Sequence, residues 1–211
     1  MLRIARAITL LGEQTGSEFL IYNPLVQYGF ERAARRNAPV FARSLLAEFP
    51  DLRRVVDVGC GTGAYVATLL SLGINAIGVE YSARLRRKCR DRGVRVFPFD
   101  LRQGTPPPPD APFDLAYSLE VAEHVPPEHA GAMVDYVAGL SDVVVFTAAQ
   151  PGQGGPHHIN EQPREFWIKQ FEKRGMKLHD AVTERLARRL QEGRAFYYLP
   201  RNVSVFLRDA R

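Results

Sequence analysis

Residues 55–70, VVDVGCGTGAYVATLL, decide how the rest of the chain is interpreted. The apolar start predicts a buried strand that ends at Asp57. Three alternating glycines then predict a sharp bend, because glycine accepts positive φ and permits close approach of a ligand to the backbone: Gly59, Gly61 and Gly63. The helical pattern that follows places a helix N-terminus behind the bend, where negative charge is favoured. These residues therefore predict a ligand-binding bend between a strand and a helix.

The composition is that of a soluble globular chain. The sequence has 211 residues, two cysteines and a formal net charge of +5. This length predicts one domain, residues 1–211, with a core of its own. Cys60 and Cys89 lack CxxC spacing, so neither a disulfide framework nor a cysteine-based zinc site is expected. Apolar stretches of membrane-span or signal-peptide length are missing, and we expect a cytoplasmic protein without a membrane partner.

Arginines gather in three groups, which have two interpretations. They could steer an anionic substrate or a nucleic acid, or they could form solvated helix faces. Acidic residues interleave with the arginines, which favours solvated faces. The groups are Arg32, Arg35 and Arg36; Arg84, Arg86, Arg87, Arg90 and Arg92; and Arg185, Arg188, Arg189 and Arg194.

The chain divides into three parts. Residues 1–50 predict a small N-terminal helical cap, with a helix over 17–49 that is interrupted near Asn23. Strand and helix patterns alternate through residues 51–150, which predicts an α/β fold with a parallel sheet and helices on both faces. Residues 151–211 predict a Gly/Pro/His loop, an amphipathic helix over 164–175 and a last strand over 202–208. The earlier strands are predicted over 53–58, 75–80, 94–100, 113–119 and 142–149.

Polar residues recur at the predicted carboxyl ends of the strands, where open parallel sheets bind their ligands. These residues are Asp57, Glu80, Asp100, Glu120 and Gln150. The spacing Gly59-x-Gly61-x-x-Ala64 with Glu80 downstream also fits a loose dinucleotide fingerprint, so a nicotinamide dinucleotide competes with a smaller nucleoside. A carboxylate two residues before the first glycine would repel a pyrophosphate. Three carboxylates around the site therefore favour a cationic ligand.

At this point the chain resembles the class I S-adenosylmethionine-dependent methyltransferases. The segments that carry the resemblance are VVDVGCGTG, AIGVE, VFPFD and FDLAYSLEVAEHVPPE, in this order, within about residues 50–150. The resemblance implies a Rossmann-like, doubly wound, mostly parallel seven-stranded sheet and S-adenosylmethionine as cofactor. It also assigns cofactor-binding residues: Asp57, Gly59, Gly61 and Glu120 at the methionine end, Glu80 at the ribose, and Asp100 and Leu101 at the adenine.

The segment LEVAEHVPPE contains candidates for chemistry at Glu120, Glu123 and His124. If a helical turn has begun, residues three and four apart share a face, and these side chains would converge on a divalent cation. The E-x-x-E-H spacing is similar to that of quinone O-methyltransferases and small-RNA 2′-O-methyltransferases, where it implies a metal cluster. A further ligand would have to come from His157 or His158. Without a metal, His124 would be a general base with a near-neutral pKa, or would orient the substrate.

The loop GQGGPHHINEQP follows the fifth predicted strand, so we expect it to overhang the substrate side. Its glycines suit a movable lid, and His158 is a candidate catalytic residue within it. The alternative is a solvent-exposed loop in which Asn160 or Glu161 only caps the next helix. Trp167 and Phe171 have helical spacing and are expected in the core. Aromatic residues of the cap, Tyr22, Tyr28 and Phe30, would either close over the cofactor or pack.

These patterns favour methyl transfer from S-adenosylmethionine to an oxygen of a small molecule, such as a sugar or a secondary metabolite. A first alternative is an RNA 2′-O-methyltransferase-like enzyme with a divalent metal at the E-x-x-E-H segment. A second is a cofactor-binding protein without catalytic activity, and a nicotinamide-dependent oxidoreductase comes last. A nucleic-acid partner is therefore less favoured than a small molecule. The sequence carries no signal for the oligomeric state.

Overall fold

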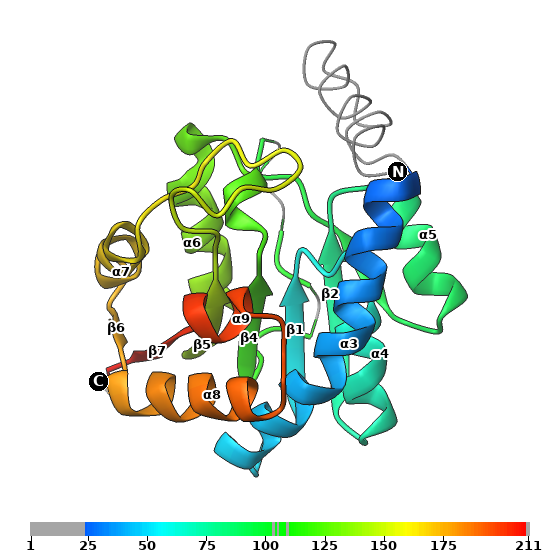
Figure 1. Ribbon diagram of the computed structural model, residues 1–211, viewed down its shortest axis with the longest axis horizontal. Coiled ribbons are helices and arrows are strands. Elements are labelled where there is room, and N and C mark those ends of the chain that lie inside the picture. The colour runs from blue at the N-terminus through cyan, green and yellow to red at the C-terminus, as the bar shows by residue number, and fades with distance from the viewer. Residues whose placement is uncertain (1–23, 103, 105, 109, 210–211) are drawn as a thin grey trace.

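A central sheet organises the computed structural model, which describes residues 24–102, 104, 106–108 and 110–209. Within these residues the sheet has seven strands in the order β3-β2-β1-β4-β5-β7-β6, with helices against it (Figure 1). The strands are β1 (Arg54–Val58), β2 (Asn75–Glu80), β3 (Val96–Pro98), β4 (Leu115–Leu119), β5 (Val143–Thr147), β6 (Met176–Leu178) and β7 (Ser204–Arg208). The predicted α/β class and seven-stranded sheet are confirmed.

The sheet is parallel except at one side. β1 pairs in parallel with β2 and β4, and the parallel pairing continues from β2 to β3 and from β4 to β5. β7 runs antiparallel between β5 and β6. A doubly wound dinucleotide-binding sheet instead has a sixth parallel strand beside the fifth. The inserted antiparallel strand therefore separates this topology from that of a nicotinamide-dependent dehydrogenase.

The helices cover both faces of the sheet and enclose two apolar clusters (Figure 1). Helices α3, α4 and α8 pack on one face, and α6 and α7 pack on the other. Successive strand residues alternate between the clusters, with Val55 on the first face and Val56 on the second, as the period of a strand requires. The helices are α3 (Pro24–Glu48), α4 (Ala64–Ser71), α5 (Ala83–Asp91), α6 (Ala130–Leu140), α7 (Arg164–Glu172), α8 (Asp180–Glu192) and α9 (Tyr198–Asn202), with the 3-10 turns η1 (Ala122–His124) and η2 (Pro127–His129).

The structure differs from the predicted elements at several places. The predicted strand over 94–100 shortens to β3, because the chain leaves the edge of the sheet at Pro98, which has no N–H to donate. Both β6 and α8 were missed: β6 has only three residues, and α8 follows it directly. Within the described residues the cap is α3, which begins at Pro24, so the predicted start at residue 17 and Tyr22 lie outside them. Across the described residues, every helix is too short or too polar to cross a bilayer.

The predicted core positions on α7 are confirmed. Trp167 is 3% exposed and Phe171 is fully buried. The ring of Phe171 stacks on Phe206 of β7 with 4.0 Å between ring centroids. This contact fixes α7 against the antiparallel part of the sheet, and α7 directly follows the loop that lines the site described below.

We expect Phe171→Ala to lower the free energy of unfolding by about 3–5 kcal/mol, because it removes a buried ring and leaves a cavity. Urea unfolding followed by circular dichroism measures the change. Tyr28→Ala is the matched control, since Tyr28 is 70% exposed and its truncation should change the free energy by less than about 0.5 kcal/mol. Equal effects of the two substitutions would contradict this assignment of the core.

Candidate functional site

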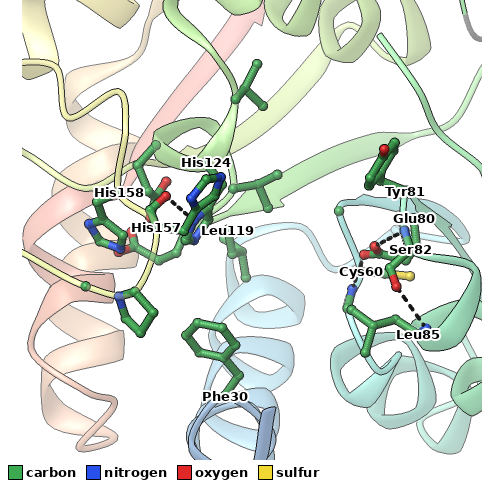
Figure 2. A pocket seen from close by; sticks show the side chains of 18 of the residues that line it. Phe30, Cys60, Glu80, Tyr81, Ser82, Leu85, Leu119, His124, His157 and His158 are labelled. Atoms are coloured by element: carbon green, nitrogen blue, oxygen red, sulfur yellow. Dashed lines mark hydrogen bonds between the residues drawn. The ribbon is translucent and has the colours of Figure 1, made fainter. Parts of the chain in front are cut away.

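A cavity of about 680 Å³ opens beyond the carboxyl ends of β1, β2 and β4. Its wall combines the glycine bend, the end of β2, the turn η1 and the loop that follows β5, with α3 and α9 at its mouth. Figure 2 shows Glu80 and Ser82 on one side and His124, His157 and His158 on the other, with Phe30 of α3 between them. The cavity therefore joins the predicted cofactor end to the predicted chemistry end.

The glycine bend has the backbone that the sequence predicts. Gly59, Gly61 and Gly63 have φ values of 82°, 56° and 76°. The N–H of Gly59 donates to the carbonyl of Val79 on β2 over 2.9 Å. A Cβ atom on Gly59 would lie 2.6 Å from Val121 Cγ2, so a side chain is excluded there. The bend is thus held to β2 by the hydrogen bond to Val79 and packs closely against Val121 at the start of η1. Its backbone lines the cavity.

Glu80 connects the glycine bend to α5. Its Oε2 accepts from the Gly61 N–H over 2.9 Å, and its Oε1 accepts from the Ser82 N–H over 2.7 Å (Figure 2). Ser82 in turn caps α5 by accepting from the N–H of Leu85. Glu80 is 7% exposed and lines the cavity. A carboxylate oxygen accepts more than one hydrogen bond, so two neighbouring ribose hydroxyls fit this arrangement.

Asp57 lies at the end of β1, deeper in the cavity wall, and is 3% exposed. Burial raises the pKa of its carboxyl group well above the ordinary value, while the Tyr117 hydroxyl acts in the opposite direction. A cation bound beside Asp57 would stabilise the ionised carboxylate. Its position in the cavity wall is the one that the sequence predicts, at the end of β1.

Asp100 and Leu101 line the cavity at its edge. The backbone and guanidinium of Arg102 both donate to Asp100, with 3.0 Å from Nε to Oδ1. The hydrogen bond from Arg102 lowers the pKa of Asp100. The Arg102 guanidinium also lies over the Tyr81 ring, 5.0 Å from its centroid. Arg102 therefore holds Asp100 at the cavity edge, a contact that no motif in the sequence indicates.

Glu120 follows β4 with a positive φ of 54°. Its carboxylate accepts from Gln153 Nε2 over 2.7 Å and from Asn202 Nδ2 over 3.0 Å. Asn202 also donates to Gln153 Oε1 over 2.8 Å. This network joins the end of β4, the loop after β5 and α9. Sequence reasoning missed Gln153 and Asn202: Gln153 lies in the predicted loop but was not singled out there, and Asn202 belongs to no motif and comes from a distant element.

The predicted metal set of Glu120, Glu123 and His124 needs a correction. It assumed a helical turn from Glu120 onward, but the positive φ at Glu120 delays the turn until η1 begins at Ala122. The group that meets is Glu123, His124 and His158, with one ligand atom from each within 4.8 Å of the others. Glu120 is not part of this group, and its carboxylate is bound by amides instead.

His124 also differs from the predicted near-neutral base. Burial lowers the pKa of its imidazole to about 4, and the neighbouring His158 adds to the shift. Nδ1 of His124 lies 3.0 Å from the carbonyl oxygen of His157. A carbonyl only accepts, so Nδ1 carries the proton of the neutral ring and Nε2 carries a lone pair. At neutral pH His124 is an uncharged hydrogen-bond acceptor and a weak base.

The loop after β5 folds back over the cavity, where the sequence places it. Glu161 accepts from the N–H groups of Gly152 and Gly154 over 2.8 and 2.7 Å, and from His158 Nδ1 over 2.8 Å. Asn160 is 2% exposed and its N–H donates to the carbonyl of Glu123 over 3.0 Å. Asn160 is therefore an internal anchor that ties the loop to η1, while Glu161 holds His158 in place.

Several arginines of the three groups serve structural contacts. Arg92, the C-cap residue of α5, donates to the Thr62 carbonyl over 2.7 Å and forms an ion pair with Glu31 of α3. Although burial raises the pKa of Glu31, hydrogen bonds from Arg92, Thr62 and Arg35 lower it to about 2. Arg92 thus ties α5 and the glycine bend to the cap.

Comparison with known proteins gives the family of the central segment. A family model described as a methyltransferase domain matches residues 56–137. A ubiquinone biosynthesis O-methyltransferase of Methylococcus capsulatus (strain ATCC 33009 / NCIMB 11132 / Bath) is 32% identical over 79 residues. The match covers 35% of this chain and 33% of that relative, so it spans about a third of the relative's length.

Solved methyltransferase structures share the fold over most of the chain. Magnesium protoporphyrin IX methyltransferase from Synechocystis PCC 6803, with bound SAH, has a TM-score of 0.62 and 19% identity, covering 84% of this chain and 85% of that chain. The sugar N-methyltransferase KedS8 from Streptoalloteichus sp ATCC 53650 has a TM-score of 0.65 and 17% identity, covering 88% and 92%. The amino pentose methyltransferase CalS10 from Micromonospora echinaspora, with SAM bound, has a TM-score of 0.62 and 19% identity, covering 83% and 92%.

The glycine bend, the acidic strand ends, the sheet order with its antiparallel β7 and the matched domain lead to the same family. The cofactor of that family is S-adenosylmethionine, and the site offers a glycine bend and carboxylates for a cationic nucleoside. Residues 56–137 match a methyltransferase domain, and the chain has the fold of solved methyltransferases.

Proposed function

We propose that the protein transfers the methyl group of S-adenosylmethionine to an oxygen of a small-molecule acceptor. The observation that carries this proposal is the imidazole of His124 in the wall of the cavity, with its Nδ1 held 3.0 Å from the carbonyl oxygen of His157. A lone pair on Nε2 can accept a hydrogen bond from an acceptor hydroxyl and aim its oxygen at the methyl group. The relative from Methylococcus capsulatus, named for O-methylation, and the sugar and porphyrin methyltransferases of similar fold support a small acceptor.

The shape and charge of the cavity support the same acceptor class. At about 680 Å³ the cavity has the size of sites that enclose small molecules. Phe30, Ile159 and Tyr197 lie at its mouth and are 40%, 43% and 63% exposed. Such a mouth favours a partly apolar, ring-containing acceptor over a phosphate backbone.

The cofactor roles are proposed residue by residue. The backbone of Gly59 and Gly61 and the carboxylate of Asp57 would hold the methionine end, with Glu120 beside the acceptor. The carboxylate of Glu80 would accept from the ribose hydroxyls. At the other end of the molecule, the adenine would lie between Asp100 and Leu101. All of these residues line the cavity.

Methyl transfer to oxygen needs alignment more than activation, because a sulfonium already carries a good leaving group. The acceptor oxygen attacks the methyl carbon in line, the carbon–sulfur bond breaks and S-adenosylhomocysteine leaves. The hydroxyl proton passes to water or to a buffer base, since an imidazole with a pKa of about 4 does not retain it at neutral pH. The protein's own part is to hold the two reactants together and to exclude water from the methyl group.

The proposed function is tested with methyl-labelled S-adenosylmethionine, the purified chain and fractionated extract of the host. We expect label in the small-molecule fraction, in a product whose new methyl group resists mild acid and is bonded to oxygen by mass spectrometry. Label in RNA would overturn the proposal and give the arginine groups a function. Label on a nitrogen of a small molecule would contradict transfer to oxygen. It would still support a small molecule as the methyl acceptor.

The raised pKa of Asp57 predicts how cofactor binding depends on pH. In the free protein Asp57 takes up a proton as the pH falls through its raised pKa, and the ammonium of bound S-adenosylhomocysteine lowers that pKa. Binding therefore releases a proton, and affinity should rise with pH until the raised pKa is passed. Calorimetric titrations between pH 5 and 8 measure this slope. In Asp57→Asn we expect a lower affinity and a smaller slope, and an unchanged slope would contradict the role of Asp57.

We expect His124→Ala to lower turnover of the identified acceptor by about 100-fold, because the acceptor oxygen loses its orienting hydrogen bond. The dissociation constant for S-adenosylhomocysteine should stay within about twofold, since His124 lies at the acceptor end. In the wild type, the pH profile of kcat should show no inflection from His124 between pH 5.5 and 8, because its pKa is about 4. An inflection near 6.5 that disappears in His124→Ala would contradict the orienting role.

A further inference from the structure

The two cysteines of the chain, 29 residues apart in sequence, meet in the folded protein. Sγ of Cys60 in the glycine bend lies 3.8 Å from Sγ of Cys89 on α5. Both are free thiols, with Cys60 6% exposed and Cys89 fully buried. The sequence has no CxxC spacing, so only the fold reveals this pair. The two sulfurs are close enough for a covalent bond to form after a small movement.

Two glycines leave the space that the sulfurs occupy. A Cβ atom on Gly78 of β2 would lie 2.4 Å from Cys60 Sγ, and a Cβ atom on Gly63 would lie 3.1 Å from Cys89 Sγ. The Cys89 thiol also donates to the carbonyl oxygen of Gly61 over 3.2 Å. The bend, β2 and α5 thus enclose the two sulfurs, and the surrounding backbone holds them against each other.

The two thiols differ in acidity. The pKa of Cys89 is lowered because its sulfur accepts from the Cys60 thiol, and Arg92 and Arg90 add to this effect although burial opposes it. The pKa of Cys60 is raised because its thiol donates to Cys89, and burial and nearby carboxylates act in the same direction. The thiolate is the form of cysteine that attacks another sulfur. Cys89 therefore has the properties of the thiol that closes a disulfide.

Cys60 is the sulfur that a small reagent can reach. It lines the cavity on the same side as Glu80 (Figure 2), whereas Cys89 is fully buried. A molecule as small as hydrogen peroxide can therefore approach Cys60 through the cavity. The same route means that a ligand bound at the cofactor end of the cavity would shield Cys60 from the reagent.

We propose that Cys60 and Cys89 are a modification site at which hydrogen peroxide forms a reversible disulfide. The Cys60 sulfur attacks one peroxide oxygen, the O–O bond breaks, and the thiol proton leaves with the other oxygen as water. The Cys89 sulfur then attacks the sulfur of the Cys60 sulfenic acid, the S–O bond breaks, and the hydroxyl leaves with the Cys89 proton as a second water. Two thiols and one peroxide give one disulfide and two waters, so sulfur is oxidised and the peroxide oxygens are reduced. A reducing dithiol reverses the reaction by exchange.

The disulfide would act on the cofactor end of the cavity. A sulfur–sulfur bond is about 2.05 Å long, so the two sulfurs must approach each other from 3.8 Å. The N–H groups of Gly59 and Cys60 both donate to the Val79 carbonyl, which ties the bend to β2. The approach therefore strains the bend or shifts α5, the two elements that Glu80 connects. Oxidation would thus weaken binding of S-adenosylmethionine, a consequence that rests on the proposed cofactor roles, whereas the modification site rests on the geometry of the pair.

The site is tested on the full, reduced chain with hydrogen peroxide at pH 7.5, followed by intact-mass spectrometry. We expect a product that is lighter by two hydrogen atoms, a Cys60–Cys89 link in its peptide map, and full reversal by dithiothreitol. In Cys89→Ser the disulfide cannot form, so peroxide should leave Cys60 as a sulfenic acid that dimedone traps. Two thiols that survive peroxide in the wild type, or a link between two chains in place of the internal one, would overturn the proposal.

The effect on binding is measured by calorimetric titration of S-adenosylhomocysteine before and after peroxide. We expect a loss of affinity of about fivefold or more in the wild type, restored by dithiothreitol, and slower disulfide formation when S-adenosylhomocysteine is bound.

The matched control is Cys60→Ser, which retains every other oxidisable side chain. Its affinities before and after peroxide should agree within about twofold, which excludes an effect of methionine oxidation. A wild-type disulfide form with unchanged affinity would overturn the effect on the cofactor site. A disulfide that forms in a chain that binds no S-adenosylhomocysteine in either state would support the modification site and count against the proposed function.

Discussion

The Glu80 carboxylate, buried between the glycine bend and α5, is the contact on which the site depends. It accepts from the N–H groups of Gly61 and Ser82, so the bend and the N-terminus of α5 are held at one distance from the end of β2. Only a doubly accepting group satisfies both donors, and burial makes the loss of either bond costly. The same carboxylate lines the cavity, so the group that fixes the bend also lies in the wall of the proposed cofactor site.

The opposite end of the cavity is held by a second set of contacts, which come from the loop after β5. Glu161 positions His158, Asn160 ties the loop to η1, and Gln153 reaches the carboxylate of Glu120. Under the proposed function, cofactor binding would fall on the parallel half of the sheet, and acceptor recognition would fall on the loop and α9 beside the antiparallel β7.

The sequence predicted the features that local patterns govern. The bend followed from its glycines, and the acidic strand ends followed from strand periodicity, because both depend on neighbouring residues. The predicted metal set included Glu120, whose backbone has a positive φ and whose carboxylate accepts from the amides of Gln153 and Asn202, two residues remote in sequence. The lowered pKa of His124 could not be predicted from the sequence either, because it results from burial, which depends on all the elements that form the cavity. His158 was recognised as a candidate, but its distance from Glu123 required the fold.

The central claim is that Glu80 joins the structure of the bend to the binding of S-adenosylmethionine. The most direct measurement is a calorimetric titration of S-adenosylhomocysteine into the wild type and Glu80→Gln, with thermal unfolding recorded for both. Glutamine replaces one acceptor with a donor, so it opposes one of the two backbone N–H groups and loses the charge that strengthens the ribose hydrogen bonds. The account predicts at least a tenfold loss of affinity, about 1.4 kcal/mol or more, in a chain that still unfolds cooperatively. An unchanged dissociation constant in a folded Glu80→Gln chain would contradict it.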